Sequence, residues 1–181
     1  PVVGMVGVIN DVTMAVGNRF VAADEEIFIL GQDENQNDGW LGASLYAAHQ
    51  GISAIYAPPP IDLDAEEQTG KLIVQMIASK AVTAAHDISD GGLAVAIAEM
   101  CLYSSFGAHI TPPTDGHPHG WAFGEDQARY VVTTADGALL TKAAQKADTA
   151  ISKIGKVTLK TELQFGDDDT ISVCELKNVF E

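Results

Sequence analysis

Residues 85–92, with the sequence AHDISDGG, place two carboxylates and two glycines directly before the apolar segment LAVAIAEM. This order predicts the end of a strand, an acidic turn and the start of a helix. We expect Asp90 to cap the helix, because an N-cap carboxylate accepts hydrogen bonds from N–H groups of the first turn. We expect Gly91 and Gly92 to let the backbone turn sharply and to leave room for a ligand.

The turn contains the residue types that bind a phosphate or a metal ion. A helix start attracts phosphate through its free N–H groups and the positive end of its dipole, and Asp87 and Asp90 could hold Mg²⁺ directly or through water. The candidate nucleotide- or phosphate-binding residues are therefore Asp87, Ser89, Asp90, Gly91 and Gly92, with Asp87 and Asp90 as candidate metal ligands. The alternative is an ordinary tight strand–helix connection, since a short glycine motif alone has low specificity.

A second polar set lies in residues 123–132, FGEDQARYVV. If this segment is a strand, Glu125, Gln127 and Arg129 share one face, because side chains along a strand alternate with a period of two. A carboxylate, an amide and a guanidinium on one face could hold a polar substrate. The alternative is the polar face of an edge strand.

The histidines offer two further possibilities. His86 could act as a general base beside Asp87, but we expect it instead to hydrogen-bond the turn and to orient Asp87. His117 and His119 could bind a metal from one side of an extended loop. We expect instead that the Pro- and Gly-rich residues 111–122 form a solvated connection.

Length and charge limit the function classes. The chain has 181 residues, 46% of them hydrophobic, which suits a single domain over residues 1–181 with a substantial core. Its formal net charge of −15 argues against binding to nucleic acid. No apolar run approaches the roughly 18 residues of a membrane helix, so we expect no membrane partner and a cytoplasmic location.

Apolar spacing predicts the elements that position these residues. We expect a buried strand at residues 2–9, further strands and a C-terminal hairpin, and three long helices; the ranges are strands at 27–30, 81–87, 123–132 and 157–160, a hairpin of 163–165 with 170–174, and helices at 62–80, 92–101 and 137–153. A short helix is expected after residue 41, ending at Gly51. The order favours a mixed sheet covered by helices.

Four segments resemble, in order, the C-terminal part of the formylglycinamidine ribonucleotide synthetases, which belong to the aminoimidazole ribonucleotide synthetase-like superfamily. They are PVVGMVGVINDV at residues 1–12, LGASLYAAHQG at 41–51, HDISDGGLAVAIAEM at 86–100 and FGEDQARYVV at 123–132. The resemblance implies an α+β fold, a three-layer α/β/α C-terminal domain with a mixed sheet. It also implies that residues 1–10 are a strand entering from an ATP-binding domain, and that the chain is a fragment of a longer protein.

The resemblance implies an activity for that longer protein. ATP phosphorylates the amide of formylglycinamide ribonucleotide, and ammonia, supplied from glutamine by a glutaminase domain or subunit, displaces the phosphate to give the amidine. The implied cofactors are ATP or ADP and Mg²⁺, and the implied partners are N-terminal ATP-binding domains and the glutaminase. For the chain alone we expect no activity and a supporting or auxiliary nucleotide-binding role.

Two other interpretations stay open at the level of sequence. The chain could be a non-catalytic structural module, or the matching domain of selenophosphate synthetase, thiamine monophosphate kinase or the hydrogenase maturation protein. Three positions depart from the family pattern: Ala43 replaces a glycine, Leu45 an acidic residue and Asp126 a serine.

Overall fold

Seven strands form one sheet in a computed structural model that describes residues 4, 6–31, 39–52, 57–167 and 169–180. The order across the sheet is β2-β4-β1-β5-β3-β6-β7. The strands are β1 (Glu26–Leu30), β2 (Ala84–Asp87), β3 (Gly107–Ile110), β4 (Tyr130–Thr134), β5 (Ile151–Thr158), β6 (Glu162–Phe165) and β7 (Asp169–Ser172). Only the β3–β6 pair is parallel, so the sheet is mixed, as predicted.

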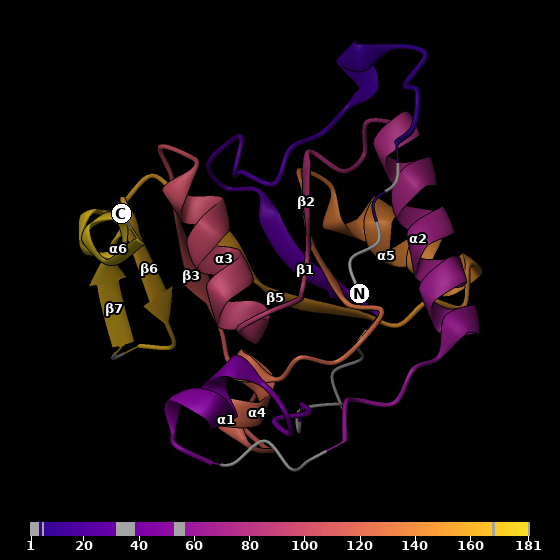
Figure 1. Cartoon of the computed structure of the whole chain (residues 1–181). Coiled ribbons are helices and arrows are strands. Elements are labelled where there is room, and N and C mark those ends of the chain that lie inside the picture. The colour runs from indigo at the N-terminus through magenta and orange to yellow at the C-terminus, as the bar shows by residue number, and fades with distance from the viewer. Residues whose placement is uncertain (1–3, 5, 32–38, 53–56, 168, 181) are drawn as a thin grey trace.

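Helices cover both faces of this sheet, with α3 lying across one face and α5 behind the other (Figure 1). The helices are η1 (Val12–Met14), α1 (Leu45–His49), α2 (Leu63–Ala78), α3 (Gly92–Leu102), α4 (Pro118–Phe123), α5 (Gly137–Lys146) and α6 (Val173–Phe180). Within the described residues no helix is both long and apolar enough to cross a membrane.

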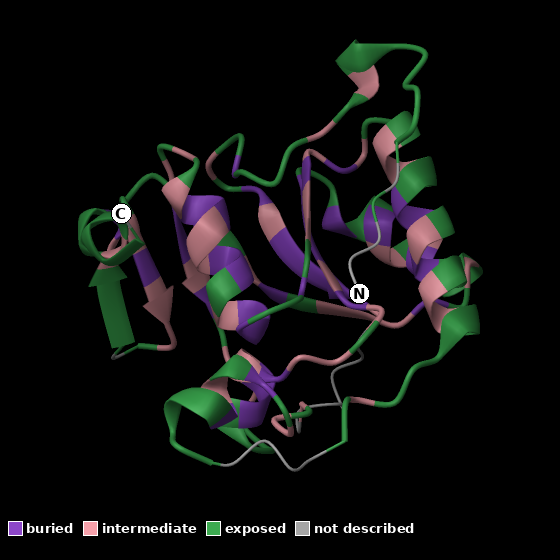
Figure 2. Ribbon diagram, viewed as in Figure 1, coloured by how far each residue is buried: buried purple, intermediate pink, exposed green. Residues whose placement is uncertain are grey.

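Strand β1 separates two layers of core. Ile27 and Ile29 pack on the side of α3, whereas Phe28 and Leu30 pack against α2 and α5. This alternation follows from the period of two along a strand. Buried residues therefore line the strands and the inner helix faces (Figure 2), and the predicted three-layer α/β/α fold is confirmed.

A buried strand was expected at residues 2–9, and the described part of this range does not form one. Of these residues, 4 and 6–9 are described and lie outside any strand. Val6 and Val8 are almost fully exposed. Their apolar pattern finds no partner strand among the described residues.

Two other elements differ from expectation. Residues 111–122, expected as a connection, include α4, because Pro118 suits a first helical turn and Trp121 is buried. The helix expected at 137–153 ends at Lys146, and Gly155 lies inside β5 instead of ending a helix. A Cβ on Gly155 would lie 2.2 Å from the His109 carbonyl oxygen, so this glycine permits close approach of β3.

The remaining expectations are mostly confirmed. The helix expected at 62–80 is α2, whose N-cap Asp62 accepts hydrogen bonds from two backbone N–H groups. The hairpin of β6 and β7 forms as predicted, but its second strand ends at Ser172 and α6 follows, a helix that the sequence analysis missed.

Candidate nucleotide pocket

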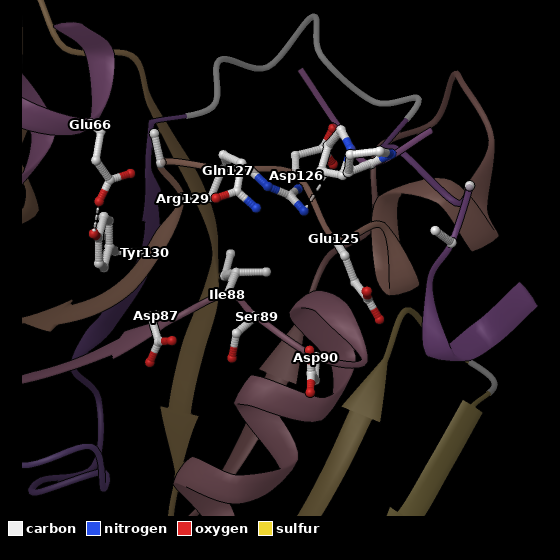
Figure 3. A pocket seen from close by; sticks show the side chains of 15 residues that line it. Glu66, Asp87, Ile88, Ser89, Asp90, Glu125, Asp126, Gln127, Arg129 and Tyr130 are labelled. Carbon is white, nitrogen blue, oxygen red and sulfur yellow. Dashed lines mark hydrogen bonds and ion pairs between the residues drawn. The ribbon is translucent and has the colours of Figure 1, made fainter. Parts of the chain in front are cut away.

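A cavity of about 420 Å³ opens at the end of the sheet where β2 ends and β4 begins. Its walls come from residues 42–43, 58–59, 87–90 and 125–130, and from Glu66 of α2 (Figure 3). The lining residues are Gly42, Ala43, Pro58, Pro59, Glu66, Asp87, Ile88, Ser89, Asp90, Glu125, Asp126, Gln127, Ala128, Arg129 and Tyr130. Six of the eight site residues chosen from the sequence therefore line one cavity, whereas Gly91 and Gly92 do not.

The turn before α3 is built by its glycines. Gly91 and Gly92 have φ angles of 82° and 72°, in the left-handed region that favours glycine. A Cβ on Gly92 would lie 2.6 Å from the backbone carbon of Phe123. Gly92 therefore makes room for the chain at the end of α4, whereas the sequence analysis expected room for a ligand.

The expected cap by Asp90 is wrong. The N-cap of α3 is Gly91, without a side-chain cap bond. The N–H of Gly91 instead donates to Oε1 of Glu125, 2.8 Å away and 34 residues later in the chain. Asp90 is exposed and has no hydrogen-bond or ion-pair partner among the described residues, which leaves its carboxylate available to a ligand.

The expected strand at 123–132 begins only at Tyr130, so Glu125, Gln127 and Arg129 do not share a strand face. The extended chain is interrupted at Ala128, which has a φ angle of 60°. Glu125 points toward the start of α3 (Figure 3), and Gln127 is exposed at the pocket.

Arg129 belongs to the wall and is almost fully buried. Its Nη2 donates to the carbonyl oxygen of Gly124 at 2.6 Å and lies 3.0 Å from Oδ2 of Asp126. Burial lowers the pKa of the guanidinium, and the Asp126 charge opposes that shift. Arg129 therefore stabilises residues 124–129 through contacts within that segment, and the Asp126 carboxylate balances its charge.

Tyr130 and Glu66 form a pair on another wall that the sequence analysis missed. The Tyr130 hydroxyl donates to Oε1 of Glu66 (Figure 3). Burial and this carboxylate raise the pKa of Tyr130 to about 12. The two residues lie 64 positions apart in the chain, so no local spacing could indicate the pair.

His86 holds the turn, as expected. Its Nδ1 lies 2.7 Å from the carbonyl oxygen of Asp87 and its Nε2 lies 3.0 Å from Oε2 of Glu99. Both ring nitrogens therefore face acceptors. The ring fixes the backbone that presents Asp87 at the pocket.

The pocket lining is strongly acidic. Five carboxylates face it against a single guanidinium, that of Arg129; they belong to Glu66, Asp87, Asp90, Glu125 and Asp126. An anionic ligand would therefore need a cation with it. The exposed carboxylates of Asp87 and Asp90 suit Mg²⁺, which typically takes one or two carboxylates together with phosphate and water oxygens.

In the described part of the chain no three His, Cys, Asp or Glu side chains are placed so that they could hold a metal ion by themselves. His119 uses its Nδ1 with the Tyr46 hydroxyl, 2.9 Å away, and His117 precedes α4. These residues were expected in a solvated connection; instead His119 lies within α4 and contacts Tyr46.

Comparison with known protein families identifies the family to which this chain belongs. The family described as "AIR synthase related protein, C-terminal domain" matches residues 22–168. The chain belongs to this family, and the family prediction is confirmed.

The curated relatives narrow the class. The phosphoribosylformylglycinamidine synthase subunit PurL of Methylocella silvestris is 40% identical over 183 residues, covering 100% of this chain and 24% of the relative. The subunit of the same name from Azorhizobium caulinodans is 43% identical over 159 residues, covering 86% of this chain and 21% of the relative. The chain thus spans about a quarter of the length of these relatives.

Solved structures share the fold. Thermotoga maritima PurL complexed with FGAR superposes with a TM-score of 0.75 at 20% identity, covering 91% of this chain and 30% of that one. The Escherichia coli hydrogenase maturation protein HypE gives 0.59 at 12% identity, covering 87% and 51%. The PurL fold is the nearer of these two.

Proposed function

We propose that the chain is the C-terminal domain of a synthetase that converts formylglycinamide ribonucleotide, ATP and glutamine-derived ammonia to formylglycinamidine ribonucleotide. We propose that its pocket is an auxiliary nucleotide site. The observation that carries the proposal is the convergence of residues 87–90 with residues 125–130 in one cavity. A Thermotoga maritima PurL structure complexed with ATP, which shares the fold with a TM-score of 0.69, supports it.

In this proposal Asp87 and Asp90 hold Mg²⁺, with water and phosphate oxygens completing its coordination. A magnesium ion held there would offset the phosphate charge that the acidic lining would otherwise repel. The exposed amide of Gln127 and the hydroxyl of Ser89 offer hydrogen bonds to the polar groups of the nucleotide.

The chain supports the reaction without performing it alone. The polar groups of Glu125, Asp126 and Arg129 already have partners within the wall, which favours a scaffold role for this segment. The proposed partners are N-terminal ATP-binding domains and a glutaminase domain or subunit, in the cytoplasm. Phosphate release from ATP by the chain alone, given formylglycinamide ribonucleotide and ammonia, should be undetectable; turnover would contradict this assignment.

Calorimetric titration with ADP and Mg²⁺ tests the site itself. Asp87→Asn and Asp90→Asn should each weaken binding about tenfold or more, because interactions with a charged group contribute about 1.5–3 kcal/mol. Asp90 caps nothing, so its variant should unfold at the same temperature as the unaltered chain. Asp169→Asn, an exposed change on β7, is the matched control. Unchanged affinity in both pocket variants would reject the site.

A further inference from the structure

Glu125 connects two walls of the pocket that are far apart in the sequence. Its Oε1 accepts a hydrogen bond from the N–H of Leu45 and another from the N–H of Gly91, each at 2.8 Å. Leu45 is the first residue of α1, and Gly91 is the N-cap of α3. A single carboxylate oxygen therefore satisfies backbone donors at the starts of two helices.

The backbone that carries Glu125 is itself held in place. Its N–H donates to the carbonyl oxygen of Trp40 at 3.0 Å. The carboxylate of Asp126 accepts from the N–H of Trp40 at 3.0 and 3.1 Å and pairs with buried Arg129. The Glu125 side chain thus extends from a rigid segment.

Physical chemistry favours a carboxylate at this point. Helix starts leave N–H groups without intrahelical partners, and a negative charge there is stabilising. Hydrogen bonds to an ionised acceptor are about twice as strong as neutral ones. Because α3 has no side-chain cap bond from its own N-cap, Glu125 provides that interaction from a distant part of the chain.

We propose that Glu125 is a positioning residue of the pocket. It fixes the start of α3, and with it Ser89 and Asp90, relative to α1 and to Gly42, and so sets the shape in which a nucleotide binds. This inference rests on the proposed function of the pocket. It assigns Glu125 to the architecture of the wall, in place of the substrate contact that its sequence motif suggested.

Amide hydrogen exchange, followed residue by residue by NMR, tests the positioning role without any ligand. Glu125→Ala should speed exchange at both Leu45 and Gly91 by about ten- to a hundredfold, the loss of one charge-assisted hydrogen bond at each. Glu125→Gln keeps an acceptor oxygen and should stay within a few-fold of the unaltered chain. Glu67→Ala, which removes an exposed carboxylate of α2, is the matched control and should change neither amide.

The exchange experiment can also contradict the proposed role of Glu125. Unchanged exchange in the alanine variant, or a change at only one of the two amides, would overturn the shared-oxygen role. Where the alanine variant does not fold, Glu125→Asp replaces it: this variant keeps the charge but withdraws the oxygen by one methylene, and the same loss of protection is expected at both amides.

Binding of ADP with Mg²⁺ separates positioning from direct action on the ligand. Affinity should fall about tenfold or more in Glu125→Ala and stay within about threefold in Glu125→Gln, since the glutamine oxygen preserves the wall. Equal losses in both variants would mean that the charge itself acts on the ligand, which overturns the inference. If the unaltered chain binds no nucleotide, the proposed function fails, while the exchange experiment still decides the role of Glu125.

Discussion

At the residue scale, Gly92 shows how the pocket depends on backbone conformation. The residue has a φ angle of 72°, and any Cβ would collide with the backbone at the end of α4. Moving a side chain cannot relieve this clash, because the neighbouring atoms of Phe123 and Gly124 belong to the main chain. The glycine therefore holds α3 and α4 in contact behind the pocket.

Gly92→Ala should lower the free energy of unfolding by about 2–5 kcal/mol, from left-handed strain and overpacking together. Urea denaturation measures this. Gly70→Ala in α2 is the matched control, because nothing lies within 4 Å of its Cβ position. Alanine there should stabilise the chain by about 0.5–1 kcal/mol. Equal stability of the Gly92 variant and the unaltered chain would contradict the described turn.

Glu26 predicts a pH dependence. Its carboxylate accepts from Lys153 and from the N–H of Gly137, and the hydrogen bond with Lys153 lowers the pKa of Glu26. The folded chain then binds this proton more weakly than the unfolded chain. The stabilisation is therefore complete above the unfolded pKa of about 4.3 and is lost as pH falls through the folded pKa.

Glu26→Gln should accordingly be less stable than the unaltered chain at pH 7. Its stability should fall less between about pH 5 and pH 3, because the titrating group is gone. Urea midpoints measured across this range check the difference. Parallel curves for the two chains would mean that Glu26 does not contribute.

The sequence pointed to six of the fifteen residues that line the cavity, but their contacts were predicted wrongly. Asp87, Ser89 and Asp90 line the cavity as the turn motif predicted. The N–H of Gly91, however, is satisfied by Glu125, a residue that local spacing cannot connect to it. Capping rules consider only nearby residues, so a cap supplied from another segment is invisible in the sequence.

At the element scale, segments with one clear hydrophobic period were predicted correctly, and segments whose pattern fits both a helix and a strand were not. Helix α2 and strand β1 form where the pattern indicated them. The start of strand β5 was mistaken for the end of a helix, because Ile151 and Ile154 continue the helical spacing that precedes them, whereas the strand expected at 157–160 overlaps the end of β5. Residues 151–158 form a strand because they pair with both β1 and β3. Such pairing is a tertiary interaction, so the local pattern does not show it.

Helix α3 gives a prediction about thiol reactivity. Cys101 lies fully buried on this helix, and burial raises the pKa of its thiol to about 12. Thiolate is the reactive form. Cys174 on α6 is exposed. Ellman's reagent at pH 8 should therefore modify one thiol per folded chain and two after denaturation; two rapid modifications of the folded chain would contradict the burial of α3.

At the scale of the whole molecule, apolar residues near the N-terminus lie exposed on the surface. Val6 and Val8 are almost fully exposed, although their sequence is typical of a buried strand. The chain spans about a quarter of its curated relatives. Both observations support the proposed packing of this chain against N-terminal ATP-binding domains.

We propose that the acidic pocket binds a nucleotide together with Mg²⁺. Thermal unfolding of the chain with ADP or ATP, with and without Mg²⁺, tests it most directly. At 100 times its dissociation constant the ligand should stabilise the chain by about 2.7 kcal/mol, or about 5–10 °C. This shift should appear only with Mg²⁺ and should be lost in Asp90→Asn. No shift, or an equal shift without Mg²⁺, would contradict the assignment of Asp87 and Asp90 as the metal ligands of a nucleotide site.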